Sequence, residues 1–234
     1  MKIHRFYTEE NLRGRKEVES QKLLNQMKNV LRLEVGEEVT LFDNSGFDFL
    51  SKIKEYKKDF VVLEILKENK NTVFLEKEIY LFASLVKKDK YEWIVEKATE
   101  LGVSHIVPII SDRSEKKNVN KERLNKIIIE AGEQCGRAVL PILYEPIHIK
   151  EAVKKYSNIK SIVWEPKAPR YSKNELEIIK KEVKTLGMYI GPEGGYTNDE
   201  LKIFEDNNIL MYSLCSQTLK TETAVISALT LLAF

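Results

Sequence analysis

A glycine-rich segment between a predicted strand and a predicted helix constrains this chain most. Residues 190–197 read Ile-Gly-Pro-Glu-Gly-Gly-Tyr-Thr; they follow the apolar run Leu186–Ile190 and precede the polar-faced helix predicted at Asn198–Asn207. Glycine has no Cβ and tolerates positive φ, so the backbone of such a loop can approach a ligand closely. Because ligands of α/β proteins gather at the carboxyl ends of strands, the segment predicts a ligand-binding loop. The alternative is a tight turn without a ligand.

The loop does not match the common phosphate-binding motifs. Tyr196 and Thr197 follow the last glycine, where a P-loop carries Lys and then Ser or Thr. The chain also has no G-x-G-x-x-G sequence. We therefore expect a nucleoside-type ligand held by backbone groups, and not a triphosphate.

The bulk composition indicates a globular protein of one or two domains. The chain has 234 residues, of which 43% are hydrophobic, enough for a substantial core. Lys and Arg number 38 against 36 Asp and Glu, a net charge of +2, so bulk charge alone does not indicate a nucleic-acid binder. Basic residues nevertheless cluster in two segments, with a solvated surface as the alternative reading: Lys87, Lys88 and Lys90, then Arg113, Lys116, Lys117, Lys121 and Arg123.

Metal binding and membrane insertion are not expected. The two cysteines, Cys135 and Cys215, lie far apart, and the three histidines are scattered, so no metal-ligand spacing is present. The start Met1–Phe6 lacks the apolar stretch of a signal peptide, and no run of about 18 apolar residues occurs. The sequence predicts a cytoplasmic protein with no membrane partner.

The first 70 or so residues predict a small β-rich module. Short strands separated by tight turns and one helix are typical of a barrel-like fold. The polar segment Glu68–Thr72 is the expected linker. We expect strands at Ile3–Tyr7, Glu37–Phe42, Phe47–Glu55 and Phe60–Leu66, and one helix at Val18–Asn29.

From Ile79 onward strands and helices alternate, which predicts an α/β domain. The last segment, Thr221–Phe234, has almost no polar face, so we expect a buried helix that also packs against a partner subunit. Thr221 is its predicted N-cap. The other expected elements are strands at Ile79–Val86, Ser104–Ile110, Ser161–Trp164, Leu186–Ile190 and Leu210–Leu214, and helices at Asp89–Leu101, Asn120–Cys135, Asn174–Lys184 and Asn198–Asn207.

Five sequence blocks, taken in order, resemble one known family. They are Glu96–Val103; Pro108 with Asp112-Arg113-Ser114; Glu133–Arg137 with Pro141; Ile190–Gly195; and Leu219–Ala224. Together they resemble the bacterial SPOUT-class methyltransferases that make 3-methyluridine in small-subunit ribosomal RNA. Arg5-Phe6-Tyr7 and Val30-Leu31-Arg32 extend the similarity over nearly the whole chain.

The resemblance implies a fold and a function. The fold would be a PUA-like, RNA-binding β-barrel in residues 1–70 and an α/β SPOUT domain in residues 73–234 with a C-terminal trefoil knot. Members act as homodimers, bind S-adenosyl-L-methionine in the knot and need no metal. The expected reaction is methylation of uridine N3 in 16S ribosomal RNA, within the assembled small subunit. Cys215, Gln217 and Lys220 depart from residues common in relatives.

Two other function classes stay open at this point. The first is a non-catalytic RNA-binding or ribosome-assembly protein with an inactive knot. The departures at Cys215, Gln217 and Lys220 suggest this alternative. The second is an enzyme whose glycine loop binds a different nucleotide. Binding of S-adenosyl-L-methionine and methyl transfer to small-subunit RNA would separate the expected function from both.

The resemblance also assigns candidate residues, with structural alternatives. Glu193 and Glu222 are the carboxylates nearest the predicted loops, and either could orient uracil or accept its proton; loop bracing and helix N-terminal electrostatics are the alternatives. The candidate cofactor residues are Glu165, Ile190, Gly191, Gly194, Gly195, Leu214, Thr218, Leu219 and Thr223. The candidate RNA-binding residues are Arg5, Lys28, Arg32, Arg113, Arg137 and Lys220.

Overall fold

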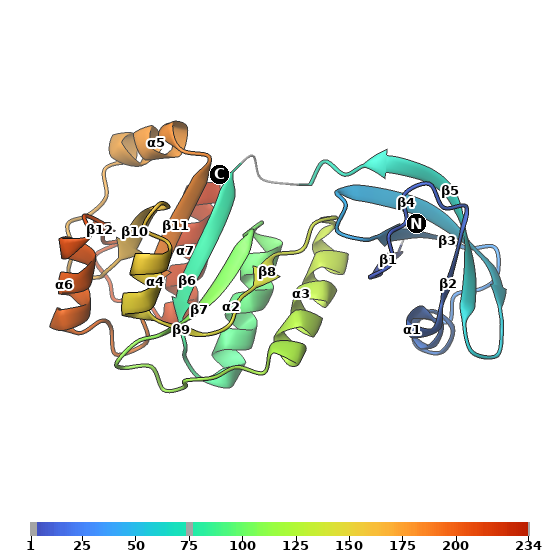
Figure 1. Ribbon diagram of the computed structural model, residues 1–234, viewed down its shortest axis with the longest axis horizontal. Helices are drawn as coiled ribbons and strands as arrows, with labels where there is room; N and C mark the ends of the chain where they lie inside the picture. The colour runs from blue at the N-terminus through green and yellow to red at the C-terminus, as the bar shows by residue number, and fades with distance from the viewer. Residues whose placement is uncertain (1–3, 74–76, 234) are drawn as a thin grey trace. The chain divides into compact units, whose positions relative to one another are not determined.

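The computed structural model describes residues 4–73 and 77–233. The chain forms two compact units, and each is described by itself. The first comprises Met1–Phe74 with Gly132–Leu140, and the second comprises Leu75–Ala131 with Pro141–Phe234. The elements of both are labelled in Figure 1.

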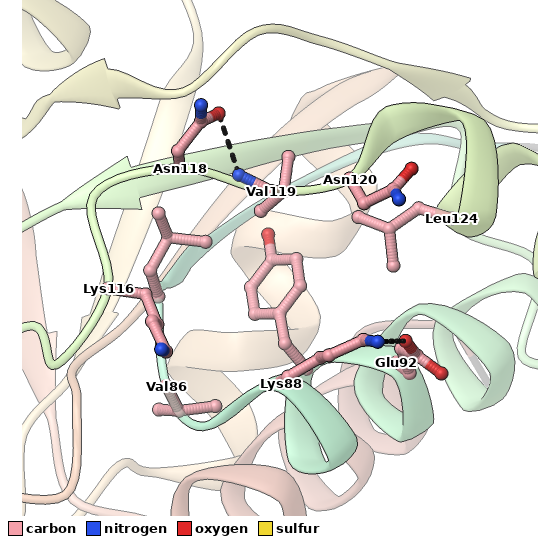
Figure 2. Close-up of a pocket in the computed structure, with 10 residues that line it drawn as sticks. Val86, Lys88, Glu92, Lys116, Asn118, Val119, Asn120 and Leu124 are labelled. Atoms are coloured by element: carbon pink, nitrogen blue, oxygen red, sulfur yellow. Dashed lines mark hydrogen bonds and ion pairs between the residues drawn. The ribbon is translucent and has the colours of Figure 1, made fainter.

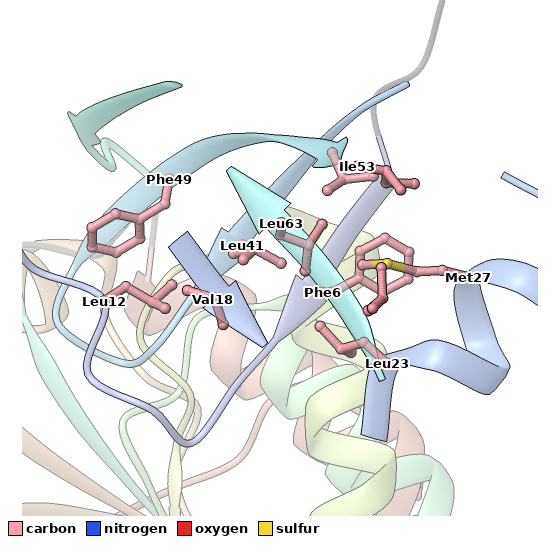
Figure 3. Packing of buried hydrophobic residues seen from close by; sticks show 11 residues of the cluster. Phe6, Leu12, Val18, Leu23, Met27, Leu41, Phe49, Ile53 and Leu63 are labelled. Carbon is pink, nitrogen blue, oxygen red and sulfur yellow. The ribbon is translucent and has the colours of Figure 1, made fainter. Parts of the chain in front are cut away.

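The first unit is built on a sheet with strand order β1-β3-β4-β5-β2. β1 runs parallel to β3, whereas the other neighbours are antiparallel. Alternate residues of these strands point into one apolar cluster, where Phe6, Leu41 and Leu63 meet Met27 (Figure 3). The strands are β1 (His4–Tyr7), β2 (Glu17–Ser20), β3 (Glu38–Phe42), β4 (Phe47–Tyr56) and β5 (Val61–Lys70).

The expected helix at Val18–Asn29 is wrong for its first turn. Residues Glu17–Ser20 form β2, because Val18 and Ser20 turn inward while β2 pairs with β5. The Ser20 hydroxyl then accepts from the Leu23 amide and caps α1 (Gln21–Leu24), as N-cap serines do. A π-helical segment, η1 (Asn25–Val30), follows. The expected linker is also corrected, because Glu68, Asn69 and Lys70 continue β5 opposite β4.

Residues Gly132–Leu140 pack with the first unit, which the sequence boundaries at 70 and 73 do not anticipate. The Tyr7 amide donates to the Glu133 carboxylate at 3.0 Å, and the Asn71 side-chain amide donates to the Gly136 carbonyl at 3.0 Å. No local sequence pattern predicts these long-range hydrogen bonds. The block Glu133–Arg137 therefore belongs structurally with the β-rich unit.

The second unit is an α/β fold, as predicted, on a parallel sheet of order β12-β10-β11-β6-β7-β8, with β9 also paired to β7. Both faces are covered, so neighbouring strand residues such as Leu81 and Phe82 are equally buried, as expected for parallel strands. The strands are β6 (Glu78–Ser84), β7 (His105–Ile110), β8 (Ile142–Leu143), β9 (Ile147–His148), β10 (Lys160–Trp164), β11 (Thr185–Ile190) and β12 (Leu210–Tyr212).

The helices of this unit pack in two groups. α4 and α6 contact each other and cover Phe82 and Tyr189 on one face of the sheet, while α7 packs on α2 and β11. The helices are α2 (Lys88–Glu100), α3 (Lys121–Cys135), α4 (Ile149–Lys155), α5 (Lys173–Glu182), α6 (Asn198–Asp206) and α7 (Thr221–Ala233).

Some elements were not predicted from the sequence, and some predictions fall on residues outside the described ranges. β8, β9 and α4 are too short for a clear periodic pattern. Thr221 is the first residue of α7 and not its cap, and its hydroxyl donates to the Gly191 carbonyl. Phe234, the expected last helical residue, and Ile3, the expected first strand residue, lie outside the described residues. The C-terminal knot stays a prediction.

The described residues contain neither a membrane-spanning helix nor a cluster of metal ligands. No helix in residues 4–73 and 77–233 is long and apolar enough to cross a bilayer. In the same ranges, no group of three or more His, Cys, Asp or Glu side chains could hold a metal ion.

A buried histidine links the first residues of β6 and β7. His105 is 7% exposed, and its Nε2 lies 2.8 Å from Glu78 and its Nδ1 3.0 Å from the Tyr144 hydroxyl. The ring also stacks on Tyr80 at 3.8 Å. The hydrogen bond from His105 is the main cause that lowers the pKa of Glu78. A lowered folded-state pKa adds stability above the ordinary carboxyl pKa, and this stability disappears as pH falls through the folded value.

We predict that His105→Ala lowers the free energy of unfolding by about 2 kcal/mol at pH 7, since it removes two buried hydrogen bonds and a ring stack. Urea unfolding at pH 7 and pH 3 measures the effect. The cost should be smaller at pH 3 than at pH 7, because the stability that comes from the lowered pKa of Glu78 is lost as falling pH protonates this carboxylate. An equal cost at both pH values would show that the Glu78 contact contributes nothing.

Candidate cofactor and RNA site

The glycine loop follows β11 at the carboxyl edge of the parallel sheet. Trp164 of β10 lies beside Ile190 of β11, which in turn lies beside Ala83 of β6. The polypeptide therefore leaves these three strands at the same edge of the sheet. Polar groups that follow the strands meet at this edge. The loop after β12 leads from this same edge to the start of α7.

Two side chains from distant segments hold the carbonyl groups of the glycine loop. The Arg113 guanidinium, after β7, donates to the Gly194 carbonyl at 2.7 Å. The Thr221 hydroxyl, at the start of α7, donates to the Gly191 carbonyl at 3.1 Å. A charged donor forms a stronger bond than a neutral one, so Arg113 is the firmer of the two contacts. The loop conformation is set before any ligand binds.

The glycines are required for different reasons. Gly195 has φ +68°, a conformation that residues with a Cβ rarely adopt. A Cβ on Gly191 would lie 3.3 Å from the Tyr196 ring, and one on Gly194 would lie 3.2 Å from Arg113 Cδ. The close approaches that the sequence attributes to a ligand are thus made, in this structure, by side chains of the chain itself.

A capping box fixes the other end of the loop. The Thr197 hydroxyl accepts from the Glu200 amide at 3.3 Å, and Glu200 Oε2 accepts from the Thr197 amide at 2.8 Å. The other Glu200 oxygen accepts from the Asp112 amide at 2.9 Å, and the side chain is 2% exposed. Sequence reasoning missed Glu200, although the spacing Thr-x-x-Glu before a helix is the usual capping-box pattern.

A small cleft opens at the same edge of the sheet, lined by Trp164 of β10, which pairs with Ile190 immediately before the loop. Its walls come from the end of β10 and from the segment between β12 and α7, and its volume is about 30 Å³. It includes the three predicted cofactor residues Glu165, Leu214 and Leu219. The indole Nε1 of Trp164 is buried and has no hydrogen-bond partner among the described residues. The other lining residues, which are not among the predicted cofactor residues, are Trp164, Pro166, Cys215, Gln217 and Ala224.

The other predicted cofactor residues divide into two groups. Ile190 is buried at the end of β11, and Gly191, Gly194 and Gly195 form the loop after it. Thr218 and Thr223 are exposed, and neither lines the cleft. The assignment of these residues to cofactor binding stays a prediction.

The two candidate carboxylates have different surroundings. Glu193 pairs with Lys90 of α2 at 2.9 Å. Partial burial raises the pKa of Glu193, but the hydrogen bond and charge of Lys90 outweigh it and leave the pKa lowered. Glu222, in the first turn of α7, has one buried oxygen, Oε2, without a hydrogen-bond partner. Glu193 is thus a stabilised anion, whereas Glu222 retains an unused acceptor.

Two of the predicted RNA-binding arginines lie inside the first unit. Arg5 pairs with Asp48 at 2.8 Å, and its side chain is 16% exposed. Arg137 is buried, and its Nε donates to the Val139 carbonyl at 2.6 Å. Burial lowers the pKa of Arg137. In this structure both guanidinium groups serve packing within the unit, and contact with RNA is not shown.

The remaining basic candidates face solvent. Lys28 and Arg32 are exposed in and after η1, beside the exposed apolar side chain of Val30. Lys220 is exposed immediately before α7. Arg113, predicted to bind RNA, instead holds the glycine loop. The exposed basic candidates are therefore Arg32, Lys220 and Lys28, whose Nζ lies 5.5 Å from the centre of the Tyr56 ring.

The two units match two domain descriptions. Residues 74–233 match the RNA methyltransferase domain, and residues 27–66 match the RNA methyltransferase PUA domain. An α/β unit that matches the RNA methyltransferase domain, together with a β-rich unit that matches the PUA domain of such enzymes, defines the class of RNA methyltransferases.

Individual relatives narrow the class. Ribosomal RNA small subunit methyltransferase E of Rickettsia conorii is 32% identical over 98% of this chain and 94% of its own length. The protein of the same name from Aquifex aeolicus is 31% identical over 98% and 99%. The crystal structure of the one from Neisseria gonorrhoeae, bound to S-adenosyl methionine, superposes with a TM-score of 0.88 at 30% identity over 98% and 96% of the two chains. The chain belongs to the ribosomal RNA small subunit methyltransferase E family.

We predict that Arg113→Ala weakens binding of S-adenosyl-L-methionine about tenfold, because a charged donor to a carbonyl contributes about 1.5 kcal/mol or more to holding the loop. Isothermal titration calorimetry measures the affinity, with Lys126→Ala, which removes an exposed cation on α3, as the control. Unchanged cofactor affinity together with weaker RNA binding would return Arg113 to the RNA-binding role that the sequence suggests.

Proposed function

We propose that this chain transfers the methyl group of S-adenosyl-L-methionine to N3 of a uridine in 16S ribosomal RNA. The observation that carries the proposal is the cleft beside the braced glycine loop, in a chain of this methyltransferase family. We further propose that it acts in the cytoplasm on the assembled small subunit. The sequence resemblance supports these last two points.

The residues of the cleft fit the cofactor chemically. Leu214 and Leu219 supply apolar contacts for an adenine ring, and Glu165 supplies carboxylate oxygens of the kind that bind ribose hydroxyls. The buried Trp164 Nε1 is a donor in need of an acceptor. The present volume of about 30 Å³ is too small for a nucleoside. The exposed segment Ser216–Thr218 must therefore move outward when the cofactor binds.

The chain has two tasks in the reaction. S-Adenosyl-L-methionine supplies a methyl group already activated by the sulfonium. The chain must align the attacking nitrogen with it and remove the imide proton of neutral uridine. We propose that Glu222 Oε2 accepts this proton, because this oxygen is buried and accepts no hydrogen bond in the described part of the chain. Glu193 instead positions Lys90, and its lowered pKa makes it the weaker base.

We propose that residues 1–70 bind the RNA and that residues 73–234 bind the cofactor. Lys28 and Arg32 would contact phosphates, which fixes the position of the RNA without reading its sequence. Val30, 66% exposed, and Leu31 lie between them and could contact an unstacked base. The match of residues 27–66 to the PUA domain of RNA methyltransferases supports this division.

We also propose that the protein is a homodimer joined through α7. Val225, Ala228 and Leu229 are buried in the unit, but the apolar Ile226 and Leu231 are only partly buried on the opposite side. A second copy would cover these side chains.

Light scattering of the purified protein should then give twice the mass of one chain, which is 27.2 kDa. A mass near 27.2 kDa would contradict the proposed dimer.

The direct test is methyl transfer with small ribosomal subunits from cells that lack this protein. Incubation with the purified chain and S-adenosyl-L-methionine should produce one 3-methyluridine in 16S ribosomal RNA, detected by mass spectrometry of nuclease fragments. Binding of the subunit without any new methyl group would instead favour the non-catalytic assembly protein. Methylation at a base other than uridine would contradict the proposed substrate.

We predict that Glu222→Gln lowers the rate of methyl transfer at least ~100-fold, as loss of a general base does. Cofactor affinity and melting temperature should stay unchanged. Glu182→Gln, at an exposed position of α5, is the control. A decrease of less than threefold would assign the proton to another acceptor and leave Glu222 a structural role.

A further inference from the structure

A second and larger cavity lies in the α/β unit between the start of α2 and the segment before α3. Its volume is about 190 Å³. Cavities of about 150 Å³ hold a benzene ring, so this one has room for a single ring of pyrimidine size. It shares no lining residue with the cleft beside the glycine loop, and eight of its ten lining residues are labelled in Figure 2: Val86, Lys88, Glu92, Lys116, Asn118, Val119, Asn120 and Leu124.

The cavity combines an apolar lining with two buried polar atoms that have no hydrogen-bond partner in the described residues, the Tyr91 hydroxyl and Glu92 Oε1. Leu85, Val86, Val119 and Leu124 contribute aliphatic surface. Tyr91 also lines it; the residue is 3% exposed, and its hydroxyl is buried without a hydrogen-bond partner in the described part of the chain. Such an orphan hydroxyl destabilises the fold. Its presence is explained if a ligand supplies the missing partner.

Basic side chains surround the opening. Lys88 and Lys116 both line the cavity, so the two basic segments that are separate in the sequence meet here. The one acid among the lining residues, Glu92, accepts from Arg123 Nε at 3.3 Å through Oε2, and its Oε1 lies 3.8 Å from Lys88 Nζ, an ion pair drawn in Figure 2. A phosphate at Lys88 would therefore compete with this weak ion pair, in which the lysine is exposed. An aromatic and aliphatic pocket with lysines at its edge is the usual arrangement for an unstacked base and its phosphate.

The asparagine side chains at the edge are oriented by the backbone. Asn120 Oδ1 accepts from the Arg123 amide at 3.0 Å, and Asn118 Oδ1 accepts from the Val119 amide at 2.8 Å, a bond drawn in Figure 2. Both carbonyl oxygens are thus used, and the NH₂ groups remain as donors. Donors next to a small apolar cavity suit a ring with carbonyl oxygens, such as a pyrimidine.

The same segments also contact the glycine loop. Lys90, in the helix that contributes Lys88 and Tyr91, pairs with Glu193 at 2.9 Å. Arg113, three residues before Lys116, donates to the Gly194 carbonyl. A ligand in the cavity would therefore lie beside the cofactor loop but outside the cleft. It would fit a nucleotide that flanks the target uridine along the RNA strand.

We propose that this cavity binds an unstacked pyrimidine that flanks the target uridine, with Tyr91 and Asn120 contacting the base and Lys88 and Lys116 its phosphate. The proposal rests on the proposed RNA methyltransferase function for the identity of the strand. The pocket would give the enzyme a second point of sequence recognition, and would hold the strand in register with the cofactor.

Photo-crosslinking tests the location directly. The full-length protein, with S-adenosyl-L-methionine present, is irradiated with a nine-nucleotide single-stranded RNA that carries one 4-thiouridine, and crosslinked peptides are mapped by mass spectrometry. We expect crosslinks to residues 85–92 or 116–124. Crosslinks only to other segments, or none at saturating RNA, would overturn the proposal. Because the readout does not require methyl transfer, it succeeds or fails independently of the proposed activity.

Two variants with matched controls test the chemistry. Lys116→Glu should weaken binding of the same RNA at least about fivefold more than Lys117→Glu, which makes the same charge change at an exposed residue that does not line the cavity. Tyr91→Phe should weaken RNA binding about fivefold, the effect of one lost hydrogen bond. It should leave the melting temperature unchanged or raise it, since the hydroxyl has no partner in the free protein.

Each outcome is decisive. Equal effects of Lys116→Glu and Lys117→Glu would show that only diffuse charge matters, and would overturn the pocket. If Tyr91→Phe bound RNA with full affinity, the proposed contact between the Tyr91 hydroxyl and the base would be wrong. A loss of S-adenosyl-L-methionine affinity equal to the loss of RNA affinity in Lys116→Glu and Tyr91→Phe would assign the cavity to the cofactor, and would also overturn the proposal.

Discussion

The hydrogen bonds that hold the loop between β11 and α6 are the constraint on which the site depends. Arg113 and Thr221 donate to the carbonyls of Gly194 and Gly191, and Glu200 ties the far end of the loop to Asp112. These partners come from three different segments, so the loop takes its shape only when the α/β unit is folded. A preorganised backbone binds a ligand with less loss of conformational freedom than a flexible one. The proposed cofactor site and the placement of both candidate carboxylates depend on this arrangement.

The same arrangement gives the two carboxylates different chemistry. Lys90 stabilises the charged form of Glu193 and thereby lowers its pKa, which suits a group that positions neighbours. Glu222 begins α7 next to Thr221, and one of its oxygens is buried without a partner. An unpaired buried acceptor destabilises the folded protein, so its retention is best explained by a ligand proton. The orphan hydroxyl of Tyr91 supports the same kind of argument at the second cavity.

The sequence predicted the main elements because their signals are local. Apolar runs predicted β6, β7, β10 and β11, and the glycines with Pro192 predicted the loop. Val18–Ser20 was predicted as helix because its pairing partner, β5, lies some forty residues away. The resemblance predicts RNA contact for Arg5 and Arg137. The sequence does not show that Asp48, 43 residues away, pairs with Arg5, or that the Arg137 side chain turns back to the Val139 carbonyl two residues on. The contact of Lys90 with Glu193 was missed because the two residues lie far apart in the sequence, whereas Glu200 was missed despite its local Thr-x-x-Glu pattern. Contacts between distant segments, and not propensity, decide which charged side chains remain free.

Hydrogen exchange of the backbone amides tests the central claim most directly. S-Adenosyl-L-methionine should slow exchange about tenfold or more in Gly191–Thr197 and in Leu214–Lys220, while the loop amides should already be partly protected in the free protein. Fast exchange of Gly191–Thr197 in the free protein, or protection by the cofactor confined to other segments, would contradict a preformed glycine loop as the cofactor site.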